Sequence, residues 1–347
     1  MRDRDLYAPD IAKAFAILLV VFGHVLIGLF TAGLIEKTPF WMAVHDGIYL
    51  FHMPLFFYLS GLFFEKSLSR YGYKGLVKKN VLTLLCPLVV WSYIQTSLQY
   101  LAGANANNRP DLQQVFMAPV PPQQQFWFLG ALFVIIAVVG LVYKTRSPRQ
   151  YIYGLLALFL FNFAFWNAMI DMMRTDKFVF FLGQIILHIP YFVMGIVLGQ
   201  EKIGSLRLHP IICVLLFALA IYAYLVETVL PSLVLGACSI LCIITVYKMA
   251  EHIAEFLSKH SAGVLKAICF VGMNTMIIYL AHIIVAGAVR AILLKTGIID
   301  SAAHLFLATA AGVMLPLLAV PVGLCLQKYW PKFTGAVLPV RIERKIA

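Results

Sequence analysis

Ten apolar segments, each close to the length needed to cross a lipid bilayer, constrain this chain more than any other feature. A transmembrane helix needs about 20 consecutive apolar residues. Soluble domains carry roughly 25% charged residues, whereas this 347-residue chain has 12% charged and 62% hydrophobic residues. We therefore predict an all-α, polytopic transmembrane bundle, with residues 1–347 forming one integral-membrane domain. The predicted spans are 12–34, 45–64, 81–102, 126–143, 150–168, 178–199, 209–227, 230–248, 267–289 and 303–326.

The first apolar segment is expected to stay in the protein as a transmembrane helix. From Phe15 to Leu34 it is longer than the apolar region of a secretory signal peptide, which has roughly 7–15 residues. The preceding "MRDRD" has balanced charges, and no clear A-x-A cleavage site follows.

Basic residues concentrate on one side of the predicted membrane. If the amino terminus is cytoplasmic, 20 of the 27 Lys and Arg residues lie in cytoplasmic segments, 6 lie in outer segments, and Lys13 lies within the first helix. Cytoplasmic loops of membrane proteins carry such an excess. The bias predicts cytoplasmic amino and carboxyl termini, and it accounts for the net charge of +12 without a nucleic-acid partner.

The cysteines and histidines show no metal-binding spacing. All six cysteines fall in apolar segments without a C-x-x-C pair, which indicates neither a disulfide framework nor a zinc site. No H-E-x-x-H motif or close carboxylate–histidine spacing favours another metal. We expect no metal and no resident cofactor.

Two predicted connections are unusual. The first cytoplasmic loop, "EKSLSRYGYKGLVKKN", either anchors the protein on anionic lipid headgroups or docks a phosphate-bearing donor. The long outer loop, "AGANANNRPDLQQVFMAPVPPQQQ", either shapes an acceptor site or is a flexible connection. The basic residues of the cytoplasmic loop are Lys66, Arg70, Lys74, Lys78 and Lys79.

The first helix carries ionisable residues that an apolar span does not need. Lys13 and His24 are 11 residues apart, which places them on one helix face about 16 Å apart along the axis. Asp10 shares this face and can pair with Lys13 across one turn. Lys13 as an interfacial anchor and His24 as a structural histidine form one interpretation. The other is a functional pair for a ligand with an anionic head and a reactive tail, as in acyl-coenzyme A.

The segments "DIAKAFAILLVVFGH" and "FHMPLFFYLSGLFF" (51–64) resemble the integral-membrane acyltransferase family 3, which includes bacterial sugar and polysaccharide O-acetyltransferases. The first-helix signature of that family is an Arg and a His separated by ten residues, and Lys13 and His24 have that spacing. Lysine keeps the positive charge but lacks the bidentate fork of arginine. The resemblance is closest to fucose and exopolysaccharide acetyltransferases, and it is weaker in "FWFLGALF", "HIPYFVMGIVLG" and "NTMIIYLAH".

The resemblance implies transfer of an acyl group, usually acetyl, from cytosolic acyl-CoA to a hydroxyl of a sugar or glycan, by a protein of the bacterial inner membrane. On this hypothesis Lys13, Asp10 and the basic loop bind the donor, and His24 is the general base. His52 orients the acceptor or donates to the developing oxyanion. An acyl-His24 intermediate stays open. A proton-coupled transporter of a small solute is the alternative function, although no inverted repeat is apparent.

Seven further residues are candidates for lining the same pocket, and each also has a packing explanation. By helical rise, His282 lies at a depth similar to those of His24 and His52, and His188 lies nearer mid-membrane. Ser60 belongs to a Ser-Gly step that allows close helix packing. The candidates are Ser60, Trp127, His188, Tyr191, Asn274, Tyr279 and His282.

Overall fold

The computed structural model describes residues 3–103, 106–143, 154–155, 157–162, 172–226, 231–329 and 340. All regular secondary structure in these residues is helical, so the predicted polytopic helical bundle is confirmed. The helices are α1 (Asp3–Thr31), α2 (Pro39–Leu62), α3 (Phe64–Asn80), α4 (Cys86–Ala102), α5 (Leu112–Phe116), α6 (Trp127–Val142), α8 (Lys177–Ser205), α9 (Pro210–Val226), α10 (Pro231–His260), α11 (Ala262–Met273), α12 (Thr275–Lys295), α13 (Ser301–Leu317) and α14 (Ala319–Tyr329).

Seven helical segments of the described chain are long and apolar enough to cross a membrane, and each corresponds to a predicted span. The predicted span 45–64 is α2, which has 24 residues but is not among the seven. The span 209–227 is α9, a shorter apolar helix of 17 residues. The predicted span 150–168 lies largely outside the described residues.

One predicted connection and one predicted span differ from the structure. The basic segment after α2 is the helix α3, because its Glu, Leu, Lys and Arg residues have high helix propensity. The helix is broken at Gly72, where φ is 63°. The predicted span 267–289 is divided at Asn274 between α11 and α12, and α12 continues to Lys295. Arg290 therefore lies within α12, whereas the predicted spans place it in the outer connection after residue 289.

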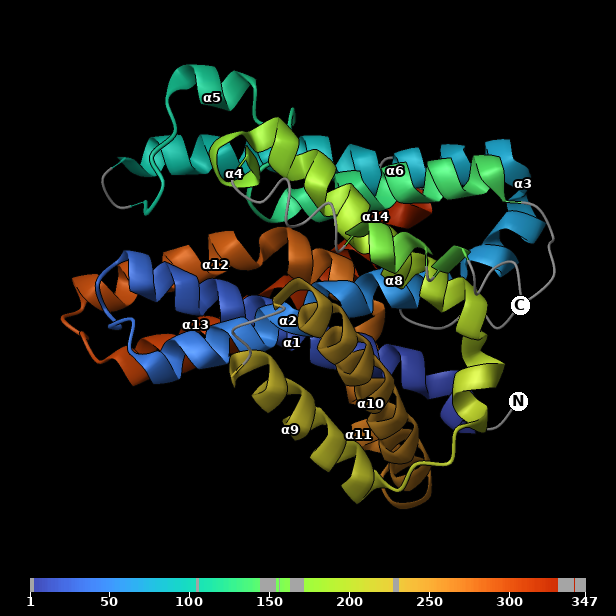
Figure 1. Ribbon diagram of the computed structural model, residues 1–347. Helices are drawn as coiled ribbons and strands as arrows, with labels where there is room; N and C mark the ends of the chain where they lie inside the picture. Colours follow the sequence, from blue (N-terminus) through green and yellow to red (C-terminus); the bar gives the residue numbers. More distant parts are fainter. Residues whose placement is uncertain are drawn as a thin grey trace.

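The helix α2 begins where the sequence supplies the appropriate residues. Thr38 has extended backbone angles, its hydroxyl accepts a hydrogen bond from the Trp41 amide at 3.4 Å, and Pro39 occupies the first helical position. In Figure 1, α1 and α2 lie in the middle of the molecule, with α12 and α13 beside them, α9 to α11 below, and α4, α6 and α8 above. These two central helices carry both predicted catalytic histidines, His24 on α1 and His52 on α2.

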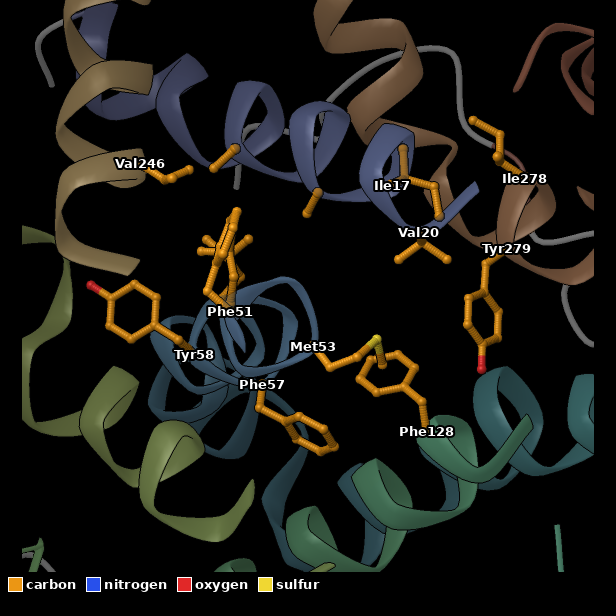
Figure 2. Close-up of a cluster of buried hydrophobic side chains, with 14 of the residues drawn as sticks. Ile17, Val20, Phe51, Met53, Phe57, Tyr58, Phe128, Val246, Ile278 and Tyr279 are labelled. Atoms are coloured by element: carbon orange, nitrogen blue, oxygen red, sulfur yellow. The ribbon is translucent and has the colours of Figure 1, made fainter. Parts of the chain in front are cut away.

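The side chains of α2 are buried on several sides of the helix. Figure 2 shows α2 nearly end-on, with Tyr58 and Met53 leaving it in opposite directions. Phe57 packs edge-to-face on Phe128 of α6, with ring centroids 5.0 Å apart. Because protein neighbours cover it on these sides, α2 can carry polar residues at membrane depth.

Two glycines allow α2 and α8 to pack at backbone distance. A Cβ atom added at Gly61 would overlap the carbonyl oxygen of Phe192 on α8. A Cβ atom added at Gly195 would overlap the carbonyl oxygen of Tyr58 on α2. Small residues permit this approach between transmembrane helices, and the contact fixes α2 against α8.

Candidate active site

His24 on α1 and His282 on α12 lie in direct contact, although 258 residues separate them. His282 Nε2 is 3.3 Å from His24 Nδ1, and the ring centroids are 5.1 Å apart. His282 is fully buried. The contact places His282, from the predicted span 267–289, directly beside His24, the candidate base on α1.

Four histidines, one each on α1, α2, α8 and α12, make the same type of local hydrogen bond. The Nδ1 atom of each lies close to the backbone carbonyl oxygen four residues earlier, at 2.9 Å for His24, 2.7 Å for His52, 2.7 Å for His188 and 3.1 Å for His282. A carbonyl oxygen only accepts, so Nδ1 carries the proton. In a neutral ring, Nε2 then holds the lone pair. His24 Nε2 is therefore available to accept a proton from a ligand.

Tyr49 joins the histidines of α1 and α2. Its ring lies edge-on to His52 at 4.7 Å and to His24 at 6.4 Å, measured between centroids, and it stacks on His45 at 4.2 Å. The Tyr49 hydroxyl is buried and has no hydrogen-bond partner among the described residues. It is thus a free donor in the middle of the site.

A cavity of about 700 Å³ borders His24 on one side. We call it the aromatic cavity, because Trp, Tyr and Phe side chains form much of its wall. His52 and His188 also line it, and His188 packs against Trp127 with centroids 5.2 Å apart. The lining residues that bear aromatic, imidazole, carboxylate or amide groups are His24, Asp46, Tyr49, His52, Gln125, Trp127, Phe159, Asn162, Phe180, Gln184, His188, Tyr191, Tyr224 and Tyr279.

A second cavity, of about 520 Å³, also borders His24. Its wall comes from the carboxyl-terminal parts of α1, α4 and α12 and from the predicted outer loop, so that loop contributes to a cavity. We call it the amide cavity after its Asn and Gln side chains. Gln125 is common to both cavities, and its backbone carbonyl accepts a hydrogen bond from the Tyr279 hydroxyl. His24 and Gln125 therefore stand between two spaces that could each hold a ligand.

The predicted donor-binding residues lie toward the opposite end of α1. Lys13 Nζ is 3.4 Å from Asp10 Oδ1 and 5.4 Å from the ring centroid of Phe63, at the junction of α2 and α3. Asp10 is 3% exposed, and its backbone packs against Gly272 so closely that a Cβ atom there would overlap it. Lys13 is thus held beside the start of the basic helix α3.

The basic residues predicted to bind the donor are carried by α3. Most of their side chains are exposed, and Lys79 Nζ lies 4.8 Å from the ring centroid of Tyr71. They form a cationic helix surface next to Lys13, and such a surface attracts phosphate-bearing ligands and anionic lipid headgroups. They are Lys66, Arg70, Lys74, Lys78 and Lys79.

Two predicted pocket residues line neither cavity. The Ser60 hydroxyl donates to the Phe56 carbonyl at 2.8 Å within α2, next to the close contact at Gly61. Asn274 is fully buried between α11 and α12, and its amide donates to the Phe270 carbonyl at 2.9 Å. Both side chains thus bond to the backbone carbonyl four residues earlier.

Comparison with known proteins identifies the family of this chain. The acyltransferase family 3, described as an acyltransferase domain, matches residues 6–323. This chain belongs to that family. Seven of its described helical segments are apolar enough to cross a membrane, and α1 and α2 carry Lys13, His24 and most of the segment 51–64 on which the resemblance rested.

Two curated relatives of this family member are nodulation proteins named NolL. The protein of Mesorhizobium japonicum is 36% identical over 138 residues, or 40% of this chain and 35% of the relative. The protein of Sinorhizobium fredii is 33% identical over 84 residues, or 24% of this chain and 22% of the relative. The matches thus span about a third or less of each relative. No solved structure matches this chain.

Sequence reasoning missed several residues of the candidate site. Tyr49 is three residues before His52, so the two lie near the same face of α2. That spacing was the one feature of the sequence that could have identified Tyr49 as a site residue. Gln95 interrupts an apolar span, and Gln124 and Gln125 close a polar run before α6. In the part of the chain that the structure describes, no group of three or more His, Cys, Asp or Glu could hold a metal ion.

Proposed function

We propose that this protein is an acyltransferase that moves an acyl group, acetyl in the first instance, from cytosolic acyl-CoA to a hydroxyl of a sugar or glycan, with His24 as the general base. The observation that carries the proposal is the position of His24. Its Nδ1 is held by the Val20 carbonyl, its Nε2 lone pair is available, and its ring borders two cavities. Two ligands can therefore meet at one imidazole.

The proposed reaction is a direct transfer. The acceptor hydroxyl oxygen attacks the thioester carbonyl carbon while His24 Nε2 takes the hydroxyl proton. The tetrahedral intermediate then expels the coenzyme A thiolate, which takes the proton back from the His24 imidazolium. The products are an O-acyl ester and free coenzyme A thiol. His282 Nε2, 3.3 Å from His24 Nδ1, can accept a hydrogen bond from the transient imidazolium and so stabilise its charge.

The geometry supports separate roles for His52 and Tyr49. Because His52 Nδ1 donates to the Ile48 carbonyl, neutral His52 has no proton on Nε2. It can orient an acceptor hydroxyl by accepting a hydrogen bond, whereas donation to an oxyanion would require a charged ring. The unpartnered Tyr49 hydroxyl is the better donor to the developing oxyanion.

Replacing Tyr49 with Phe tests the oxyanion role. The ring contacts with His45 and His52 remain possible, and the hydroxyl alone is removed. Loss of one oxyanion donor typically lowers kcat by about 10²- to 10³-fold, and we expect the donor KM to change little. A purely structural role would instead leave kcat near that of the wild type once the folded fraction is equalised by size-exclusion chromatography.

Donor turnover by the purified protein tests the proposed function itself. In detergent, radiolabelled acetyl-CoA should bind and be hydrolysed or exchanged by the wild type. Lys13→Ala should weaken donor binding by about tenfold, the usual scale for a hydrogen bond to a charged group, and Lys13→Arg should retain binding. If neither the wild type nor any variant binds the donor, the acyl-CoA proposal fails, and solute flux in liposomes becomes the assay of choice.

A further inference from the structure

The amide cavity contains a cationic side chain that no described carboxylate neutralises. Arg290 lies near the carboxyl end of α12, and its Nη1 is 3.4 Å from the carbonyl oxygen of Gly28 on α1. None of the described residues lining this cavity is Asp or Glu, and no described carboxylate forms an ion pair with Arg290. A guanidinium has five N–H donors. Most of these donors thus remain open to a ligand.

The position of Arg290 differs from that of a lipid anchor. Anchoring Arg and Lys side chains extend outward to the membrane surface, whereas Arg290 and Asn107 converge on one carbonyl oxygen of α1. Asn107 Nδ2 donates to the Gly28 carbonyl at 2.9 Å. A Cβ atom at Gly28 would lie 3.6 Å from Arg290 Nη1 and 3.7 Å from Asn107 Nδ2. The guanidinium is therefore held between α1, α12 and the outer loop, on the wall of the cavity.

Amide groups surround the remainder of the cavity and are fixed by one another. Gln125 Nε2 donates to Gln95 Oε1 at 2.6 Å, and Gln95 Nε2 donates to Gln124 Oε1 at 2.6 Å. Each amide both donates and accepts hydrogen bonds, which suits a ligand rich in hydroxyl groups. The amide-bearing lining residues are Gln95, Gln99, Asn107, Asn108, Gln124 and Gln125.

The two cavities that meet at His24 differ in charge. The aromatic cavity includes the Asp46 carboxylate and no Lys or Arg among its described lining residues. The amide cavity includes Arg290 and no carboxylate among the described residues that line it. An anionic ligand is thus attracted to the amide cavity and repelled from the aromatic one.

We propose that the amide cavity is the acceptor site and that Arg290 selects a sugar carrying an anionic group, either a carboxylate or a phosphate. The guanidinium fork binds both groups bidentately, the amides bind hydroxyls, and His24 lies on the same wall to activate one of them. The acceptor role rests on the proposed function. The binding site for an anionic sugar does not, because binding needs no donor.

Equilibrium binding to the detergent-purified full chain tests the proposal. The probes are a trigalacturonate, its carboxyl-reduced neutral counterpart, and glucose 1-phosphate. We expect an anionic probe to bind about 10- to 100-fold more tightly than the neutral trisaccharide, the range for hydrogen bonds to charged groups. Tighter binding of the trigalacturonate would indicate a uronate as the ligand, and tighter binding of glucose 1-phosphate would indicate a sugar phosphate. Arg290→Gln should remove this preference, and Arg290→Lys should retain part of it.

Arg109→Gln is the matched control. Arg109 is exposed, directly follows two residues that line the amide cavity, and does not line the cavity itself. Arg109→Gln removes one positive charge, as Arg290→Gln does, and close to the same cavity. The preference for the anionic probes over the neutral trisaccharide should survive in this variant. Equal binding of charged and neutral probes, no detectable binding of any probe, or equal losses in the Arg109 and Arg290 variants would each overturn the proposal. Anionic binding without acetyl-CoA turnover would count against the proposed function only.

Discussion

Substitution of His24 by Ala is expected to lower acyl transfer by about 10²- to 10⁴-fold, the usual contribution of a positioned general base. The physical reason is the loss of the one imidazole that borders both cavities and presents an unprotonated Nε2. The measurement is release of labelled acetate or exchange of labelled acetyl-CoA by the purified protein. Donor affinity should remain within a few-fold of the wild type, because the proposed donor contacts lie at the Lys13 end of α1.

His260→Ala is the appropriate control for this variant. His260 Nδ1 makes the same type of bond to the carbonyl four residues earlier, at 2.8 Å from Phe256, but the side chain is exposed at the end of α10. It should retain full transfer. Unchanged transfer in a folded His24→Ala protein would refute the proposed base, and trapping of an acyl group on His24 in the wild type would replace direct transfer with a two-step route.

Substitution of Gly61 by Ala is expected to cost about 1–3 kcal/mol of stability or more, the range for overpacking in a tightly packed interior. The added methyl group would overlap the backbone carbonyl of Phe192, and a backbone atom cannot rotate away as a side chain can. The helices α2 and α8 would have to separate, and His52 and His188 would move with them. The measurement is the thermal unfolding midpoint in detergent, together with the yield of monodisperse protein.

Gly263→Ala provides a control with the same chemical change. Gly263 lies in α11, is exposed, and has no atom within 4 Å of an added Cβ. Alanine is more favourable than glycine in a helix by about 1 kcal/mol, so this variant should be as stable as the wild type or slightly more stable. If Gly61→Ala melts at the same temperature as Gly263→Ala, the close contact between α2 and α8 does not exist in the membrane protein.

The helices and the first-helix pair could be predicted because each depends on local sequence. Hydrophobic length gave the spans, and the helical repeat placed Lys13 and His24 on one face. The contact of His24 with His282 could not be derived in this way, because periodicity describes one helix and not which face another helix meets. The role of Arg290 was missed for a related reason. The apolar run ends at residue 289, so the predicted span stopped one residue before Arg290. In the structure, α12 continues through Arg290 to Lys295.

The polar character of α2 has a consequence for how the protein is assembled. With His45, Asp46 and His52 in its 24 residues, α2 is the helix of the central pair that lacks the hydropathy of an independent membrane span. Its transfer into lipid alone would expose polar groups to hydrocarbon. We therefore expect α2 to leave the translocon as a hairpin with α1, to which the short segment 32–38 joins it. Its other main neighbour, α8, is synthesised more than a hundred residues later. Until α8 is synthesised, the face of α2 that includes Gly61 lacks the neighbour against which it packs in the folded protein.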